Sequence, residues 1–307
     1  VELAPWDQAH RRLRTPRPTL GRGKYVAILR IDGMIVDGRS GRLPVKPPID
    51  IPLVGAPRAG DLTVVQAARQ VAADKRAAAA VLYINSPGGS ATASEAMRQA
   101  LDQINARKPL VVAMGPVAGS GGYWVATPGR WIVARPGTLT GSIGVLTGKL
   151  VMAGLWAKLH VNRETVAFGE HVTMSNDART YSRDERQIVQ GEINRIYDLF
   201  LEIVGRARGM TREQVHPIAA GRVWTGRQAF ERKLVDELGG VDAALRKARS
   251  LAGLEAGAPA HEVRAPRRMI PPRAPAGAAG YVAWLLEGIA LVNRAPALAV
   301  MNFFIGD

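Results

Sequence analysis

The stretch Met114-Gly-Pro-Val-Ala-Gly-Ser-Gly-Gly-Tyr-Trp124 follows directly on the apolar run Pro109–Ala113. An apolar strand therefore runs into small residues that cannot fill a core, and a single serine, Ser120, stands among them. A strand-to-helix turn of this kind lifts a hydroxyl clear of the backbone and aims a helix N-terminus at whatever reacts there. The stretch predicts an α/β fold in which Ser120 is a candidate nucleophile.

A second glycine turn, Asn85-Ser-Pro-Gly-Gly-Ser90, ends the preceding predicted strand, Ala79–Ile84. Two such turns, each opening a helix, offer a nucleophile and a pair of free backbone amides for a developing negative charge. On a purely structural interpretation, both turns need glycine only for a positive φ. The layout of α/β sheets, with sites at the carboxyl ends of the strands, favours a shared site.

Strands alternate with helices along most of the chain, which predicts right-handed βαβ crossovers and a parallel sheet. The other predicted strands are Tyr25–Ile31, Leu110–Ala113, Trp131–Ala134 and Val161–Phe168. The predicted helices are Leu62–Arg76 with Asp61 as its N-cap, Ser90–Ala106, one begun at Ser120, and Leu150–Leu159. Gly38–Gly60 is expected to be an extended loop, and Thr138–Val145 a glycine-broken apolar segment.

From Ser182 onward the pattern is helical, and we expect these helices to pack on the same sheet. They are predicted at Arg183–Arg208, Thr211–Ala219, Gly226–Leu234 and Val241–Leu254. The predicted organisation is a basic linker or arm at residues 1–23, a domain at 24–255, and an Ala/Pro/Arg linker with an apolar tail at 256–307. Within the tail, Gly280–Ile305 is expected to form a buried or partner-docking helix and not a membrane anchor.

Composition excludes several classes of function. The 307 residues include no cysteine, so disulfides, thiol catalysis and thiolate metal sites are excluded, and the five histidines lack metal-ligand spacing. We expect no cofactor. The sequence contains neither a signal peptide nor a run of 18 apolar residues.

The net charge of +15 is concentrated in the arginine-rich segments Arg11–Arg22, Arg206–Arg212 and Arg264–Arg273. No nucleic-acid-binding motif and no interleaved aromatic residues accompany them, so we expect no nucleic acid as partner. Attraction to an anionic membrane surface fits the charge equally well. The arginine bias of a GC-rich genome remains a third explanation.

Four motifs follow one another along the chain: Asn85-Ser-Pro-Gly-Gly-Ser90, Ala118-Gly-Ser-Gly-Gly-Tyr123, Thr138-Leu-Thr-Gly-Ser-Ile-Gly-Val145 and Gly221-Arg-Val-Trp-Thr-Gly-Arg-Gln-Ala229. In their order and spacing they resemble signal peptide peptidase A, a family of membrane-associated bacterial serine proteases with a ClpP/crotonase-like fold. The resemblance covers roughly Tyr25 to Leu254 and leaves out residues 1–23 and the tail.

The resemblance implies a role for each matching residue. Ser120 matches the nucleophile, and the N–H of Gly89, with its neighbour Gly88, matches the oxyanion hole. Ser142 matches the serine that orients the general base; the alternative is that it simply caps or hydrogen-bonds its turn. The family's base is a buried lysine whose pKa is lowered by desolvation, so no histidine is needed near the nucleophile.

The chain departs from the family pattern at this lysine. In Gly169-Glu-His-Val172, Val172 stands where the short, single-repeat members carry the lysine. Lys149 and Lys158, at the start and near the end of the preceding predicted helix, do not match the motif. His171 is an alternative base, because histidine is the usual proton acceptor in serine catalysis.

The family's long form has two tandem repeats, the first supplying the lysine and the second the serine. This chain resembles that second, serine-bearing half. The resemblance implies that a lysine-bearing N-terminal half, with the membrane anchor, precedes it. A Val172→Lys change is expected to restore activity at most in part, because a lysine in an unprepared pocket stays charged at neutral pH. The resemblance also implies location at the extracytoplasmic face of the bacterial inner membrane.

Two functions from different classes follow from these observations. The first is half of a serine endopeptidase that degrades short apolar peptides, such as cleaved signal peptides, within a homo-oligomer at the membrane. The second is a catalytically incompetent scaffold or membrane-stress partner that retains the fold. A crotonase-type acyl-CoA enzyme is a weaker third, since it does not need the Gly-Ser-Gly-Gly turn.

Overall fold

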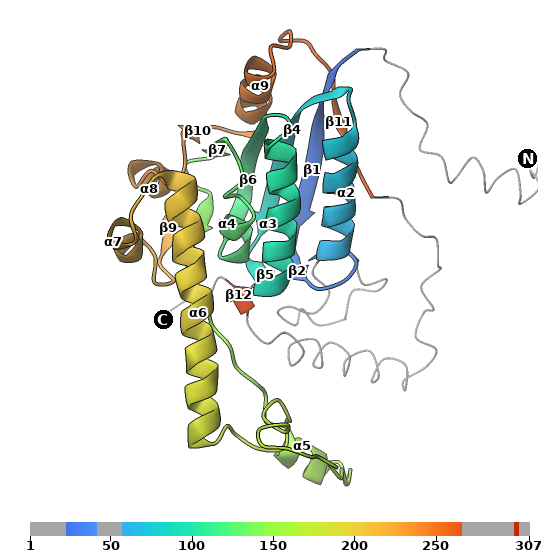
Figure 1. Cartoon of the computed structure of the whole chain (residues 1–307), viewed down its shortest axis with the longest axis vertical. Coiled ribbons are helices and arrows are strands. Elements are labelled where there is room, and N and C mark those ends of the chain that lie inside the picture. The colour runs from blue at the N-terminus through green and yellow to red at the C-terminus, as the bar shows by residue number, and fades with distance from the viewer. Residues whose placement is uncertain (1–22, 42–56, 266–297, 301–307) are drawn as a thin grey trace, which may run out of the picture.

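The main sheet is shown in Figure 1, in a computed structural model that describes residues 23–41, 57–265 and 298–300. Its strands run in the order β10-β7-β6-β4-β1-β11, and every pairing along this path is parallel. The strands are β1 (Tyr25–Asp32), β4 (Ala77–Ser86), β6 (Leu110–Gly119), β7 (Trp131–Ala134), β10 (Glu237–Leu238) and β11 (Ala260–Glu262). Two more strands, β8 (Leu139–Gly141) and β9 (Val223–Thr225), continue the sheet beside the end of β6.

Both faces of the sheet are covered, which explains why its central strands are almost continuously apolar. Alternate residues such as Leu29 and Leu82 pack with α2 (Asp61–Ala73) and α3 (Ala91–Asn105) in one buried cluster. Residues one position along, such as Val81, pack with α9 (Val241–Leu251) in another. The α/β class with a parallel sheet and βαβ crossovers is confirmed.

A small second sheet lies at the carboxyl ends of β1 and β4. It has the order β12-β5-β2-β3, with β2 (Met34–Val36), β3 (Arg58–Gly60), β5 (Gly88–Ser90) and β12 (Leu298–Val300). The chain enters it from β1 through Gly33, which has a φ of 88°. A Cβ there would lie 1.8 Å from the carbonyl oxygen of Pro57, so this crossing requires glycine.

The C-terminal helices pack on the same sheet, as the sequence predicts. The long helix α6 (Arg183–Arg208) has the predicted bounds and begins with a capping box between Ser182 and Glu185. Its buried Phe200 stacks on Trp124 with ring centroids 4.4 Å apart. The short helices α7 (Arg212–Val215) and α8 (Gly226–Glu231) and the 3₁₀ turn η1 (His216–Ile218) follow.

Between β8 and α6 the chain forms a projection of residues 149–182. From here on this projection alone is called the arm, and residues 1–23 are called the N-terminal segment. Figure 1 shows its one helix, α5 (Ala153–Lys158), near the N-terminal end of α6 and away from the sheet. The predicted strand Val161–Phe168 is wrong: those residues have no regular structure, and Val166 and Phe168 are 85% and 88% exposed. A β-favouring composition does not make a strand without a neighbour to pair with.

Other differences are local. Asp61 is the first residue of α2 and not its N-cap: its carboxylate accepts the N–H of Gly38 at 2.6 Å, and Gly60 occupies the cap position. The strand predicted at Leu110–Ala113 continues to Gly119, and the helix predicted at Leu150–Leu159 is confined to α5.

Several predicted segments lie mostly outside the described residues. They are the basic N-terminal segment 1–23, the loop Gly38–Gly60, and the linker with its apolar tail at 256–307. Within the helix predicted at Gly280–Ile305, the described residues Leu298–Val300 form a strand instead. The domain bounds at residues 24 and 255 stay a prediction.

Candidate active site

Ser120 occupies the junction between β6 and the single-turn helix α4 (Gly121–Trp124). Its backbone has a φ of 53° and a ψ of −118°, a conformation that residues with a side chain rarely adopt. Such strain persists only where the surrounding structure holds it, and it concentrates at functional sites. Here the N–H of Ser120 donates to the carbonyl oxygen of Gly141 at 2.8 Å.

The Ser120 side chain is buried and its Oγ donates to the carbonyl oxygen of Gly144 at 3.4 Å. The distance is long for an O–H···O bond, so this contact holds the hydroxyl weakly. Tyr123 and Trp124, which follow on α4, are buried in the core: the Tyr123 hydroxyl donates to Leu234, and the Trp124 indole to Glu95. Both side chains are engaged in the core, so Ser120 remains the candidate reactive group of the junction.

The second glycine turn lies beside this junction. Ser86 at the end of β4 pairs in register with Ala118 of β6, and β5 contacts α4. In addition, a Cβ on Gly122 would lie 2.7 Å from the carbonyl oxygen of Ser86, so α4 can approach β4 only because residue 122 is glycine. The structure therefore brings the two predicted turns together at one edge of the sheet.

The amides of Gly88 and Gly89 are not equivalent. The N–H of Gly88 donates to Ser86 Oγ at 3.1 Å, so this amide is already engaged. Gly89 has a φ of 156°, and a Cβ on it would lie 1.9 Å from the carbonyl oxygen of Ile35. Of the two predicted amides, Gly89 is the better candidate for an oxyanion donor. The role of Ser86 was not predicted, although it lies within the quoted motif.

Ser142 is also placed beside Ser120. It follows β8, whose Gly141 pairs in register with Gly119 of β6, directly before Ser120. Ser142 has a φ of 49°, its N–H donates to the carbonyl oxygen of Arg222 at 2.7 Å, and its side chain is 4% exposed. Within the described ranges, its Oγ has no hydrogen-bond partner, so a buried hydroxyl is left available for another group.

The described part of the chain places no lysine or histidine in hydrogen-bond contact with Ser120. Lys149 donates to the carbonyl oxygens of Met174 and Asn176, at 2.6 and 3.1 Å, within the arm. Desolvation lowers the pKa of Lys149, with a further effect from Arg179, but this amine is committed to holding the arm together.

Lys108 has a pKa that is also lowered by desolvation. It donates to the carbonyl oxygens of Val71 and Asp74, both at 2.7 Å, where it closes the C-terminal end of α2. Lys108 precedes β6, at the opposite end of that strand from Ser120, so it cannot act there.

The remaining candidate bases, His171 and Lys158, lie on the arm as well, as does Val172 at the position expected for the lysine. His171 Nδ1 is 3.9 Å from Glu185 Oε1, and Val172 is 60% exposed. Glu185 is buried and accepts two bonds from Arg179, both at 2.6 Å, which together with the N–H of Ser182 lower the pKa of Glu185 to about 2. The structure thus brings together Ser120, Ser142 and the glycine turn, and places residues 171 and 172 elsewhere.

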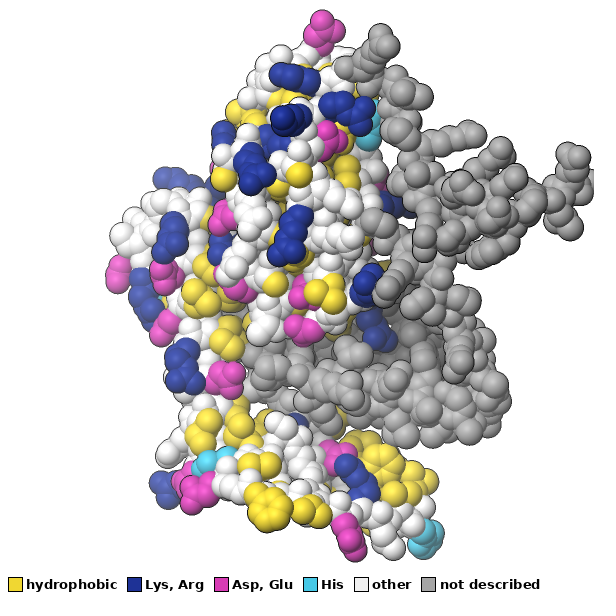
Figure 2. Space-filling view, turned by 45° about the vertical axis from the view of Figure 1, so that its right-hand side comes forward, with side chains coloured by type: hydrophobic (Ala, Val, Ile, Leu, Met, Phe, Trp, Pro, Cys, Tyr) yellow, Lys and Arg dark blue, Asp and Glu magenta, His cyan; other side chains and the backbone are white. Residues whose placement is uncertain are grey.

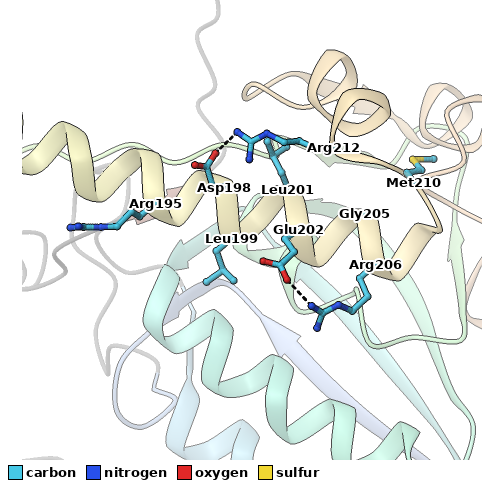
Figure 3. Close-up of a pocket in the computed structure, with 9 residues that line it drawn as sticks. All are labelled: Arg195, Asp198, Leu199, Leu201, Glu202, Gly205, Arg206, Met210 and Arg212. Carbon is cyan, nitrogen blue, oxygen red and sulfur yellow. Dashed lines mark hydrogen bonds and ion pairs between the residues drawn. The ribbon is translucent and has the colours of Figure 1, made fainter.

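A separate hollow of about 600 Å³ lies along α6 (Figure 3). Figure 3 shows two ion pairs at its surface, Asp198 with Arg212 and Glu202 with Arg206, at 2.5 and 2.6 Å. Ser120 does not line it. Among the residues that the structure describes, no group of three His, Asp or Glu residues could hold a metal ion.

Sequence similarity to known proteins identifies a peptidase family. Residues 102–255 match the pattern that defines peptidase family S49. The chain is 35% identical over 227 residues to Protease 4 of Haemophilus influenzae, covering 74% of this chain and 34% of that protein. It is 38% identical over 244 residues to Protease 4 of Salmonella typhi, covering 79% and 37%.

The serine protease SPPA of Arabidopsis thaliana chloroplasts is 34% identical over 192 residues, covering 62% of this chain and 28% of that protein. The chain thus spans about a third of the length of each of these three relatives. The family match includes β6, Ser120 and Ser142 and continues through α9. On this match and these identities, the chain belongs to peptidase family S49.

Proposed function

We propose that this chain is the serine-bearing part of a serine endopeptidase that degrades short apolar peptides, such as cleaved signal peptides. The observation that carries the proposal is the junction at Ser120, a strained serine held beside the Gly88–Gly89 turn and the buried Ser142. The protease names of its relatives support it. The proposed dyad is Ser120 with a lysine that comes from outside the chain.

In the proposed reaction, Ser120 Oγ attacks the peptide carbonyl carbon while its proton passes to the neutral lysine amine. The carbonyl electron pair moves onto oxygen, and the resulting oxyanion accepts the N–H of Gly89. Collapse expels the peptide amine, which takes the proton back from the lysine and leaves an ester on Ser120. The same lysine then takes a proton from a water molecule, whose oxygen attacks the ester carbonyl carbon. Collapse releases the peptide carboxyl group and expels Ser120 Oγ, which takes the proton back from the lysine. Throughout, Ser142 Oγ holds the lysine amine in place.

The position of Val172 supports a base from outside. Contacts within the arm hold it together. The N–H of Met152 donates to the Asp177 carbonyl oxygen at 2.8 Å, and Arg163 pairs with the Asp177 carboxylate at 2.6 Å. Figure 1 shows the arm near the N-terminal end of α6, away from α4. A lysine at position 172 would therefore be presented outward, to a neighbouring unit, and not to Ser120 of its own chain.

The arm also carries a surface suited to a partner. Figure 2 shows hydrophobic side chains gathered over the arm, which forms the lower part of that view. Single exposed apolar residues are normal on a protein surface, but a contiguous group marks an interaction site. We assign it to the lysine-bearing half or to a second copy of the chain in a homo-oligomer. Its exposed apolar residues are Leu150, Val151, Leu155, Leu159, Val161, Val166, Phe168 and Val172.

Association with an anionic membrane surface, at the extracytoplasmic face of the inner membrane, is part of the proposal, and the charge of +15 supports the attraction to the surface but not the choice of face. Among the described residues no helix is both long and apolar enough to cross a bilayer. Attraction to anionic lipid is electrostatic and needs no such helix.

A catalytically incompetent scaffold is the second candidate, and one observation favours it: the described residues offer Ser120 no base. Covalent labelling of Ser120 by a serine-reactive phosphonate separates the two functions. A protease half becomes reactive when the lysine-bearing half is added, whereas a scaffold stays unreactive.

A further inference from the structure

A row of basic residues lies at the amino-terminal end of the main sheet, the end opposite the candidate nucleophile. Four neighbouring strands, in the order β7-β6-β4-β1, each begin just after a basic residue. The residues of this basic row are all exposed: Lys24 before β1, Lys75 and Arg76 before β4, Arg107 before β6, and Arg130 before β7.

Backbone hydrogen bonds join the starts of these strands. The N–H of Tyr25 donates to the carbonyl oxygen of Arg76 at 3.0 Å, and the N–H of Arg130 to that of Leu110 at 2.8 Å. Neighbouring strands lie about 4.8 Å apart, so the basic residues form one row and not scattered charges. Figure 1 shows the second sheet at the lower ends of the strands, so the row lies at their upper ends. Over that upper part of the molecule, Lys and Arg outnumber Asp and Glu in Figure 2.

Two cations at this end have a structural role. Helices α2 and α3 both end here, and a cation near a helix C-terminus interacts favourably with the helix dipole. Lys108 is buried and donates to the carbonyl oxygens of Val71 and Asp74. Arg130 donates to the carbonyl oxygen of Asn105 at 2.8 Å. The fold alone therefore accounts for these two residues.

Three cations of the row have no such role. Among the residues that the structure describes, the side chains of Lys24, Lys75 and Arg107 have no hydrogen-bond or ion-pair partner. Like charges at the starts of neighbouring strands repel one another. An anionic surface placed against this end of the sheet would turn that repulsion into attraction.

The acidic residues on this side do not neutralise the row. Asp74 pairs with Arg76 at 3.9 Å, and Asp102 pairs with Arg98 at 2.8 Å. Glu255 lies in the loop before β11, beyond β1. The arginine-rich N-terminal segment leads directly into β1, so its attachment point is at this same end of the sheet.

We propose that the amino-terminal end of the main sheet is the surface that lies on an anionic lipid bilayer. The inference rests on the membrane association in the proposed function and names the face that makes it. Phosphate headgroups suit exposed ammonium and guanidinium groups. The candidate active site then faces away from the lipid, across the ten residues of β4, or about 33 Å at about 3.3 Å per residue. An apolar peptide therefore reaches it from the aqueous side.

The same end of the sheet is less suited to a nucleic acid. Single strands bind to charged grooves in which aromatic rings stack on the bases. Tyr25 and Trp131 begin β1 and β7, but other side chains already occupy their rings. The Tyr25 ring lies 5.2 Å from the ring of His261, and Lys247 Nζ lies 3.8 Å from the centroid of the Trp131 ring. A bilayer requires only the charge.

The first experiment measures co-sedimentation of the full chain with phosphatidylcholine vesicles, with and without phosphatidylglycerol. The edge variant Lys24→Gln/Lys75→Gln/Arg107→Gln removes the three cations that have no partner in the fold, so its thermal unfolding should be unchanged. Each Lys or Arg at an anionic surface changes affinity by about fivefold. The edge variant should therefore bind the anionic vesicles about 100-fold more weakly than the unaltered chain.

The matched control is Arg186→Gln/Arg195→Gln/Arg227→Gln, which removes the same charge from exposed positions on α6 and α8. It should lose only a few-fold in affinity. Equal losses in the two variants would overturn the inference, because net charge alone would then explain the binding. Duplex DNA or single-stranded RNA binding that is lost in the edge variant, with vesicle binding unchanged, would also overturn it.

A second experiment measures the orientation on the bilayer. The chain has no cysteine, so Leu62→Cys and Ala73→Cys each introduce a single thiol for a fluorophore. Both positions are exposed and lie at opposite ends of α2, about 16 Å apart at 1.5 Å per residue. A quencher on the lipid headgroups should quench the label at 73 far more than the label at 62. Equal quenching, or the opposite order, would overturn the proposed face.

Neither experiment requires catalysis. If the basic row binds vesicles as described but Ser120 shows neither labelling nor hydrolysis with the lysine-bearing half present, the proposed protease activity fails and the inference stands. If hydrolysis occurs but the edge variant binds vesicles as its control does, the inference fails alone.

Discussion

The backbone N–H of Ser120 donates to the carbonyl oxygen of Gly141 at 2.8 Å, which ties the candidate nucleophile to β8. Ser142 is the next residue after Gly141, and its own N–H donates to the carbonyl oxygen of Arg222 at 2.7 Å. Both serines have a positive φ. Their placement thus depends on backbone hydrogen bonds between strands, and a change to either hydroxyl should leave the scaffold in place.

We predict that Gly89→Ala destabilises the protein by about 2–4 kcal/mol, because the new Cβ meets the Ile35 carbonyl oxygen at 1.9 Å in a backbone conformation that alanine rarely adopts. Urea unfolding followed by circular dichroism measures the change. Gly137→Ala is the control, because its Cβ would meet nothing within 4 Å. Equal midpoints for the two variants would show that the glycine turn is not packed as described.

We predict that the arm loosens in acid through Glu185. Its pKa is lowered to about 2 by Arg179 and by the N–H of Ser182, below the ordinary value of 4.5. A depressed folded-state pKa contributes stability that is present above the unfolded value and is lost as the pH falls toward 2. Limited proteolysis between pH 6 and pH 2.5, with an acid-active protease, should therefore show cleavage within residues 149–182 that increases as pH falls.

Glu185→Gln tests this directly, since glutamine cannot form the charged pair with Arg179. Its arm should be cleaved readily at pH 6 and change little on acidification, while Glu164→Gln, at an exposed position, should behave as the unaltered chain does. Identical pH profiles for the Glu185→Gln variant and the unaltered chain would exclude Glu185 as the cause.

We predict that Val172→Lys does not activate Ser120 of its own chain, because position 172 lies on the arm. A gain in peptide hydrolysis, if neighbouring arms meet active sites, should rise with the square of protein concentration at low concentration. The control is Val166→Lys, another exposed position on the arm. A gain proportional to concentration for Val172→Lys alone would place residue 172 at its own Ser120.

We predict that binding to anionic vesicles depends little on the Arg206–Arg212 segment. Arg206, Arg208 and Arg212 are each paired with an acidic residue of the protein, at 2.6, 2.5 and 2.5 Å. Each unpaired Lys or Arg near such a surface contributes about 1 kcal/mol, screened by salt. In co-sedimentation, deletion of residues 1–22 should weaken binding far more than Arg206→Gln/Arg212→Gln does. The opposite order, or equal binding to neutral lipid, would contradict this.

Sequence patterns predicted the elements whose causes are local or periodic. The strands Tyr25–Asp32 and Trp131–Ala134 are buried apolar runs, and Arg183–Arg208 carries both an amphipathic repeat and a capping box. The two glycine turns were predicted to meet because parallel strands share a carboxyl edge. For the strands and the helix, the determining information lies within the segment itself; for the two turns, it lies in a general rule of parallel sheets.

The errors arose where a partner decides the structure. Val161–Phe168 has the composition of a strand but no neighbour, and Asp61 has the chemistry of a cap but pairs with Gly38 from a distant loop. Two further contacts also form only in the folded chain. The Gly88 N–H donates to Ser86 Oγ, and β12 pairs with β5. Neither can be predicted from the local sequence of one segment.

The central claim, that Ser120 is a nucleophile whose base comes from outside this chain, is tested most directly by covalent labelling. Mass spectrometry measures the rate at which a serine-reactive phosphonate modifies Ser120, with and without the lysine-bearing half, alongside Ser120→Ala. We predict slow labelling of the chain alone, labelling and peptide hydrolysis faster by several orders of magnitude with that half, and neither in the Ser120→Ala variant. Brisk labelling and hydrolysis by the isolated chain, or hydrolysis that survives Ser120→Ala, would contradict the claim.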